Sequence, residues 1–124
     1  MASRLKADLR VAHVVYAPGI LWSMSIPGSA SAIDQIEADA QDVGEVILAK
    51  AAKFAKDSGV TSVKSEVVTD LVAPAQGIVQ LAERTGVDLV VLGTRGNGGF
   101  KKLLLGSVAN SLLHYAHCSV LVTK

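Results

Sequence analysis

Apolar positions recur along the chain with two periods, and segments of the two kinds alternate. Short apolar or β-branched runs at residues 9–15, 87–92 and 118–123, and an alternating run at 62–69, predict strands. The segments between them carry apolar residues at steps of three and four, which predicts helices. This alternation favours an α/β fold, an open parallel sheet with helices on both faces and right-handed crossovers.

The clearest predicted helix lies between Ser31, which we expect to cap it together with Asp34, and Gly59, which we expect to end it. Its first half is acidic and its second half carries lysines, which suits the helix dipole. We interpret it as a packing helix without a site of its own. The apolar positions that form its predicted stripe are Ile33, Ile36, Ala40, Val43, Ile47, Ala51 and Phe54.

Two shorter helices complete the pattern. Pro74 is expected at the first position of one, which Gly86 ends, and the other is expected from about Ser107 to Ala116. The strand at 87–92 is the most apolar, so we expect it at the centre of the sheet, whereas the alternating strand at 62–69 fits an edge.

The composition of the chain excludes several classes of protein. The 124 residues are the size of one domain, 1–124, and 50% of them are hydrophobic, which excludes intrinsic disorder. A net charge of +1 gives no reason to expect nucleic acid or a membrane surface as a partner, and no apolar run is long enough to span a bilayer. The single cysteine, Cys118, excludes an intramolecular disulfide. These features predict a cytoplasmic protein.

The segment from Gly93 to Ser107 is the candidate for chemistry. It follows the most apolar strand and precedes a helix, and parallel sheets bind ligands at the carboxyl ends of their strands. Glycines let backbone amides approach an anion, and the start of a helix attracts one. Ser107 is expected to cap that helix and to donate its hydroxyl to a phosphate oxygen. Local positive charge is contributed by Arg95, Lys101 and Lys102.

The glycine spacing matches neither a P-loop nor the dinucleotide fingerprint. The pattern G-x2-G-x9-G-S, from Gly93 through Gly96 to Gly106 and Ser107, closely resembles the nucleotide-binding loop of the universal stress protein family. The resemblance extends from Leu5 to Lys124. It implies a Rossmann-like fold of the adenine nucleotide alpha hydrolase type, with the last strand at the sheet edge.

The resemblance also implies an ATP site, and each position of the family's nucleotide-binding loop corresponds to a residue of this sequence. Gly93 and Gly96 would shape the first turn of the loop, with Arg95 lying over the ribose or phosphates. Gly106 and Ser107 would hold the phosphates, together with the amides of Val108 and Ala109. Leu92 and Val14 would line the adenine pocket. Any Mg²⁺ would be held mainly by the phosphates, because the loop has no carboxylate.

One feature departs from the family. Its members begin with a hydrophobic strand that ends in an Asp on the adenine or ribose side, and a helix follows. The resemblance implies that this chain enters at the end of that helix and lacks the strand, which is the central one in the family order 3-2-1-4-5. We expect its two neighbours to pair directly or through strand exchange in a dimer, and nucleotide affinity to be lower.

The leading hypothesis is a module that binds ATP as a regulatory ligand in the stress response. The alternative is a nucleotide-free dimerisation or protein-interaction module, and the resemblance implies a homodimer through the last strand, Ser119 to Thr123. A weak ATPase ranks third, since Asp88 lies at the wrong end of its strand for phosphoryl transfer. We therefore predict no enzyme activity and no catalytic residues. His13, His114 and His117 are not spaced as metal ligands, so no metal site is predicted.

Overall fold

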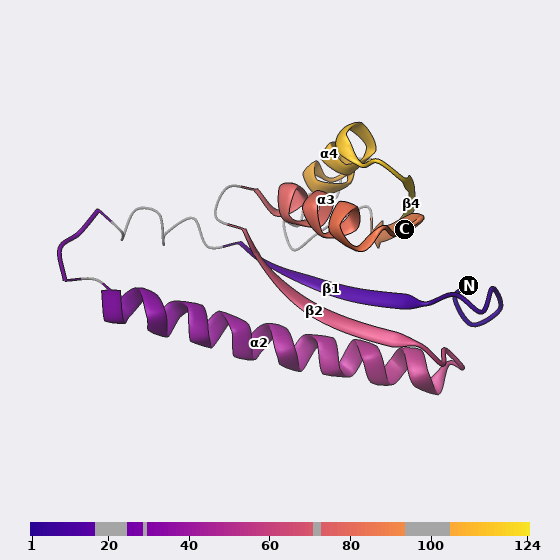
Figure 1. The fold of residues 1–124 in the computed structure, drawn as a ribbon, viewed down its shortest axis with the longest axis horizontal. Helices are drawn as coiled ribbons and strands as arrows, with labels where there is room; N and C mark the ends of the chain where they lie inside the picture. The colour runs from indigo at the N-terminus through magenta and orange to yellow at the C-terminus, as the bar shows by residue number, and fades with distance from the viewer. Residues whose placement is uncertain (17–24, 29, 71–72, 94–104) are drawn as a thin grey trace. The chain divides into compact units, whose positions relative to one another are not determined.

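The computed structural model describes residues 1–16, 25–28, 30–70, 73–93 and 105–124 (Figure 1). The chain forms two compact units, an N-terminal unit of Met1–Val72 and a C-terminal unit of Ala73–Lys124. Each unit contains one pair of parallel strands together with the helix that connects them.

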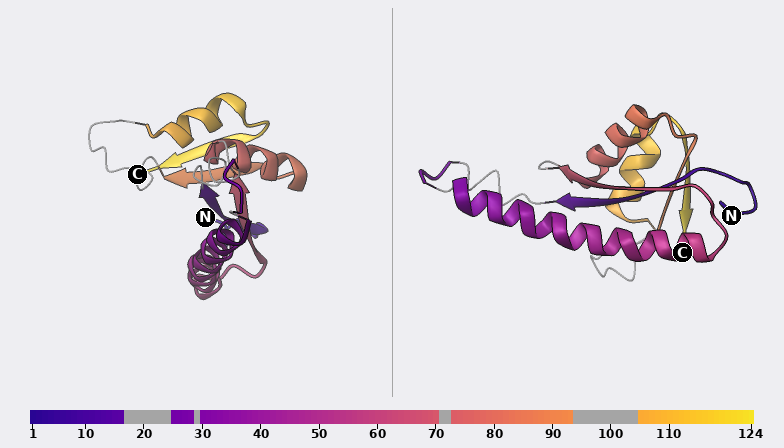
Figure 2. Two further views of the ribbon diagram at one scale, coloured as in Figure 1. Left: turned by 90° about the vertical axis from the view of Figure 1, so that its left-hand side faces the viewer. Right: turned by 60° about the horizontal axis from the view of Figure 1, so that its bottom comes forward.

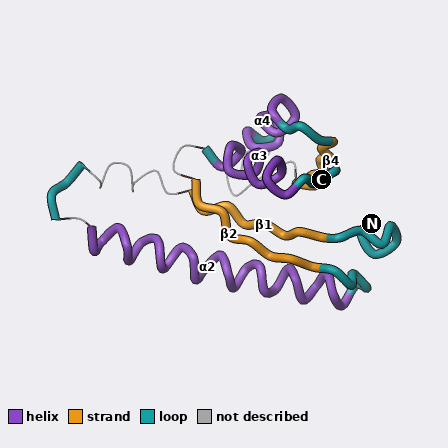
Figure 3. Tube along the Cα trace, viewed as in Figure 1, coloured by secondary structure: helices purple, strands orange, loops and turns teal. Residues whose placement is uncertain are grey.

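The N-terminal unit is a parallel strand pair with a long helix along one face (Figures 1 and 3). Strands that run in the same direction need a crossover between them, and the helix provides it. The pairing runs from Leu9 opposite Val63 to Tyr16 opposite Asp70. The elements are β1 (Leu9–Tyr16), α2 (Ala30–Asp57) and β2 (Val63–Asp70).

The helix α2 approaches the strands most closely at Gly44. A Cβ atom at this position would lie 3.0 Å from Val67 Cγ2 and 3.2 Å from His13 Cδ2. The buried residues of the helix are Gly44, Leu48 and Ala55, which lie together on one face. Gly44 therefore sets how near the helix can come to β1 and β2.

The predicted stripe of α2 is not its buried face. Ile36, Val43, Ile47 and Phe54 were expected to pack, but they remain exposed. The face that packs lies about 100° round the helix from them, since successive residues are about 100° apart. Periodicity located the apolar side of the helix, but the absence of a side chain at Gly44 decided which part of it meets the strands.

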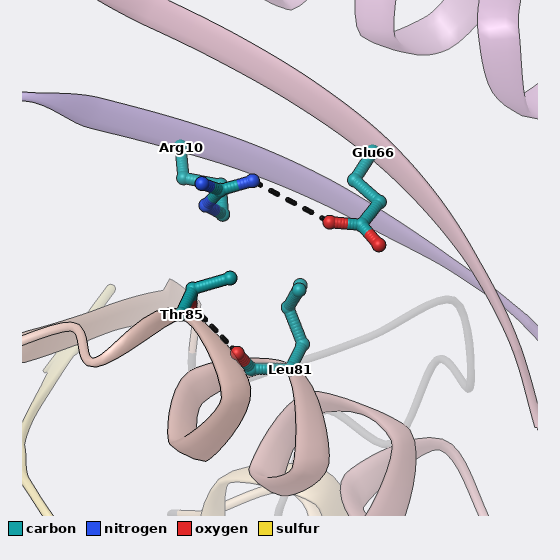
Figure 4. Close-up of polar contacts among 4 residues, drawn as sticks. All are labelled: Arg10, Glu66, Leu81 and Thr85. Atoms are coloured by element: carbon teal, nitrogen blue, oxygen red, sulfur yellow. Dashed lines mark hydrogen bonds and ion pairs between the residues drawn. The ribbon is translucent and has the colours of Figure 1, made fainter.

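The face of β1 and β2 away from α2 carries a polar contact. The Arg10 guanidinium donates to the Glu66 carboxylate, with Nη1 and Oε2 3.4 Å apart (Figure 4). Both side chains are more than a quarter exposed, so the pair contributes about 1 kcal/mol at most. Because side chains alternate along a strand and His13 faces α2, Val14 lies on the same face as Arg10.

The C-terminal unit has a parallel pair of short strands and two helices that pack against each other (Figure 2). The strands pair from Leu89 opposite Ser119 to Gly93 opposite Thr123. Leu112 and Ala109 are almost fully buried, at 0% and 1% exposure. The elements are α3 (Pro74–Thr85), β3 (Leu89–Gly93), α4 (Ser107–Tyr115) and β4 (Ser119–Thr123).

Helix ends follow the sequence signals in most places. Pro74 opens α3, and Gly86 ends it with a φ of 64° while its N–H donates to the carbonyls of Ala82 and Glu83. The Thr85 hydroxyl donates to the Leu81 carbonyl at 2.7 Å (Figure 4). The expected cap at Ser31 was wrong, because α2 already begins at Ala30 and Ser31 is inside the helix.

The parallel α/β character predicted from the sequence is confirmed, but the strand arrangement differs. In the described parts of the chain the strands form two sheets of two, with β1 paired to β2 and β3 paired to β4. The expected pairing of β1 with β3, directly or through strand exchange, stays a prediction, and β3, expected at the centre of a sheet, has β4 as its partner along one edge. Each pair is joined by one crossover helix, the most local way to align two parallel strands.

None of the helices within the described ranges combines the length and the apolar content needed to cross a bilayer.

Replacing Gly44 by Val is expected to destabilise the protein by about 2 kcal/mol, because the added carbons have no room between α2 and the side chains of Val67 and His13. Urea denaturation followed by circular dichroism measures the change. Ala49→Val is the control, since Ala49 is exposed on the same helix and should cost only the β-branched propensity, about 0.5 kcal/mol. Equal losses in the two variants would contradict the close approach.

Candidate functional site

The start of α4 is the best-defined part of the predicted site. Gly106 is the cap residue, with extended backbone angles, and its carbonyl accepts the N–H of Asn110 at 2.9 Å. Gly106 has no side chain with which to cap the helix. The predicted capping role of Ser107 was wrong, because Ser107 is already the first helical residue, and a side chain that accepts from the first amides must stand one position earlier.

The first turn of the helix presents amide donors that its own N-cap residue does not satisfy. In an α-helix the first N–H groups have no carbonyl partner in the preceding turn, which here concerns Ser107, Val108 and Ala109. The helix dipole adds partial positive charge at the same place. The Ser107 side chain is exposed, so its hydroxyl can also donate, while buried Ala109 fixes the first turn against the unit. This donor set suits an anion such as a phosphate.

The carboxyl end of β3 lies on the same side of the C-terminal unit as this helix start. The strands β3 and β4 are parallel and end together, with Gly93 opposite Thr123. Because α4 carries the chain back between them, its first turn lies at the end of the unit marked by the two arrowheads (Figure 2). The predicted residues gathered at this end are Leu92, Gly93, Gly106, Ser107, Val108 and Ala109.

The other predicted residues are placed differently. Arg95 and Gly96 lie outside the described residues, as do Lys101 and Lys102. Val14 belongs to the N-terminal unit, where it lies opposite Val68 in the strand pair. The described residues of the predicted site are thus divided between the two units.

An open cleft between α3 and α4 was not predicted. Its volume is about 530 Å³, and it includes none of the predicted site residues. Sequence reasoning missed it because small and polar residues on two amphipathic helices carry no motif. Glu83 is the charged group among its lining residues, which does not suit a phosphate. It is lined by Ala73, Ala75, Gln76, Val79, Gln80, Glu83, Ser111 and Tyr115.

The histidines and acidic residues of the described ranges do not form a metal site. His13 lies against Gly44 of α2, and His114 Nδ1 is 2.8 Å from the Asn110 carbonyl oxygen. Within the described ranges, no three His, Cys, Asp or Glu residues are grouped closely enough to hold a metal ion. Asp88 directly precedes β3, at the end of the strand opposite to Gly93.

Comparison with known sequences gives consistent matches. The sequence model of the universal stress protein family matches residues 1–124. Universal stress protein MJ0531 of Methanocaldococcus jannaschii is 34% identical over 112 residues, covering 90% of this chain, which spans 64% of that protein's length. Universal stress protein YxiE of Bacillus subtilis is 30% identical over 128 residues, covering all of this chain and 84% of its own length.

Solved structures show the same fold at lower identity. Universal stress protein UspA from Lactobacillus plantarum has a TM-score of 0.80 and 20% identity, with 99% of this chain and 81% of that chain covered. A universal stress protein solved in complex with cAMP has a TM-score of 0.63 and 24% identity, with 99% of this chain and 78% of the other covered. Because the family model matches the whole sequence and YxiE matches it end to end, this chain belongs to the universal stress protein family.

Proposed function

We propose that the chain binds an adenine nucleotide, ATP, and that the nucleotide acts as a regulatory ligand in the stress response. The observation that carries the proposal is the start of α4, where Gly106 provides no side-chain cap, at the end of the unit where β3 also ends. The G-x2-G-x9-G-S spacing joins the two elements. A related protein of the same fold has been solved with cAMP, also an adenine nucleotide, which supports this ligand class.

Each group has a role in the proposed site. The amides of Ser107, Val108 and Ala109 and the Ser107 hydroxyl donate to the phosphates. Gly106 lets a phosphate oxygen approach the backbone without a Cβ in the way. Mg²⁺, when present, is held by the phosphates. The remaining predicted contacts are Gly93, Arg95 and Gly96 around the ribose and phosphates, with Leu92 and Val14 at the adenine.

The proposed role is binding without turnover. Phosphoryl transfer needs a base and metal-binding carboxylates close to the phosphates. Asp88 precedes β3, whereas Gly93 ends it, so this carboxylate lies at the far end of the strand from the proposed phosphate site. We therefore propose a cytoplasmic, non-enzymatic protein whose residues 1–124 act as one nucleotide-responsive domain.

The second candidate function is association without nucleotide, through β4. In the described residues β4 is paired with β3 along one edge, and Leu121 on β4 is 40% exposed. An unpaired edge with apolar side chains is a template for another strand. Two copies joined through β4 by a two-fold axis would extend the sheet of the C-terminal unit, giving the homodimer that the family resemblance implies.

Replacing Gly106 by Val is expected to abolish ATP binding, because the side chain occupies the place of a phosphate oxygen. Ser107→Ala should weaken binding about tenfold, since one donor to a charged group is lost. Equilibrium dialysis with labelled ATP measures both, with folding checked by circular dichroism. Ser111→Ala, one turn further along α4, is the matched control and should bind normally. Absence of binding to folded, unaltered protein at millimolar ATP would overturn the proposal.

Replacing Leu121 by Lys is expected to reduce self-association, because its side chain would flank the partner strand at the β4 edge. Sedimentation velocity at micromolar concentration reports the mass. Val91→Lys is the control: Val91 lies opposite Leu121 on β3 and is 49% exposed, but it is one strand further from that edge. A monomeric unaltered protein, or equal effects in the two variants, would contradict association through β4.

A further inference from the structure

The helix α2 carries an apolar surface that the strands of its own unit do not cover. Ile36, Val43, Ile47 and Phe54, called here the α2 stripe, are 46%, 59%, 43% and 74% exposed. At about 100° per residue they fall within an arc of about 40°, so they form one straight row. The buried residues of the helix lie about 100° away, against β1 and β2. The row is therefore a second apolar face and not an edge of the core.

The spacing of the row is symmetric. Ile36 and Phe54 lie nine residues on either side of Glu45, and Val43 and Ile47 lie two residues on either side of it. A two-fold axis beside position 45 would bring an antiparallel copy of the row into contact with itself. Ile36 would then meet Phe54 of the second copy, and Val43 would meet its Ile47. A helix face whose pattern reads the same in both directions is self-complementary in this arrangement.

The two halves of the helix carry net charges of opposite sign. Residues 30–44 carry Asp34, Glu37, Asp39 and Asp42, and Glu45 lies at the centre. Residues 46–57 carry Lys50, Lys53 and Lys56 together with Asp57, which forms an ion pair with Lys53 at 2.8 Å, so this half keeps a net positive charge. In an antiparallel pair each acidic half lies beside a basic half, and the two helix dipoles oppose each other favourably. A parallel pair would place like charges together along its whole length.

One pair of charges stands next to the row. Asp39 and Lys50 both lie about 50° to the same side of it. Under the two-fold axis Lys50 of one copy comes to the level of Asp39 of the other. Within its own helix Asp39 Oδ1 accepts a hydrogen bond from Gln35 Nε2 at 2.8 Å, which holds the carboxylate along this side. The axis repeats the pair, so two such contacts would border the apolar row.

From this spacing and charge pattern we infer that the α2 stripe is an interface between two copies of this chain, in which two α2 helices pack antiparallel about position 45. This interface is independent of nucleotide binding. It also uses a different unit from the β4 edge, so a protein that has both contacts forms an assembly larger than a dimer.

Crosslinking tests the register directly. In a Cys118→Ser background, an Ile36→Cys protein is mixed with a Phe54→Cys protein of different mass and treated with a short thiol-to-thiol crosslinker. The mixed product is expected to form, and neither protein should crosslink to itself, because like positions are about 27 Å apart along the antiparallel helices. Association through β4 has its own measurement, the Leu121→Lys variant, so failure here leaves the β4 proposal standing.

Reversing the charges of Asp39 and Lys50 tests whether the two side chains meet across the interface. Asp39→Lys and Lys50→Asp are each expected to weaken association through α2 about threefold, and the double variant should restore it by re-forming both pairs. Val43→Glu should weaken it about a hundredfold, while Ala49→Glu, exposed elsewhere on the helix, should leave it unchanged. These values come from the yield of the mixed product as protein concentration is varied.

Three results would overturn the inference. Self-crosslinking of the Ile36→Cys protein would show a parallel pair. Absence of the mixed product at concentrations up to the millimolar range would show that another segment or another protein covers the stripe. A double charge variant weaker than both single variants would show that Asp39 and Lys50 do not meet across the interface.

Discussion

The close approach of α2 to the strand pair at Gly44 governs the N-terminal unit. With no side chain at this position the helix comes closer to Val67 and His13 than a Cβ atom would allow. A helix presents different side chains every 100° or so, and fixing one face against the strands fixes the direction of all the others. The burial of Leu48 and Ala55, and the exposure of Ile36 and Phe54, follow from that one contact.

The same constraint explains why a helix that looks like core in the sequence has an uncovered apolar face. The apolar side of α2 is wider than the face that packs on the strands, so it has apolar side chains left for a second packing partner. The strands take one part of the arc, and the remainder is a row whose spacing and flanking charges are complementary to themselves. The helix thus has the composition of an element packed on two sides, and the strand pair of the N-terminal unit covers one of them.

In the C-terminal unit the start of α4 carries the proposed site. Gly106 gives the chain an extended entry to the helix without a capping side chain, and Ser107 follows one position too late to cap it. The first amides can therefore donate to a ligand. Since parallel strands and their connecting helix run in opposite directions, these amides come to the end of the unit where β3 finishes. A nucleotide phosphate is the ligand that this arrangement and the glycine spacing favour together.

The sequence by itself determined the order of the elements, the parallel α/β class, the family and the helix signals at Pro74, Gly59 and Gly86, because periodicity and backbone preference act over a few residues. It did not determine that β1 and β3 belong to separate pairs, nor which part of the apolar arc of α2 is buried. Nor did it show that Ser31 and Ser107 fall inside their helices, a shift of one or two residues that removes a cap. The burial of one face of α2 depends on contacts between residues far apart in the chain, such as Gly44 with Val67, and only the tertiary structure decides it.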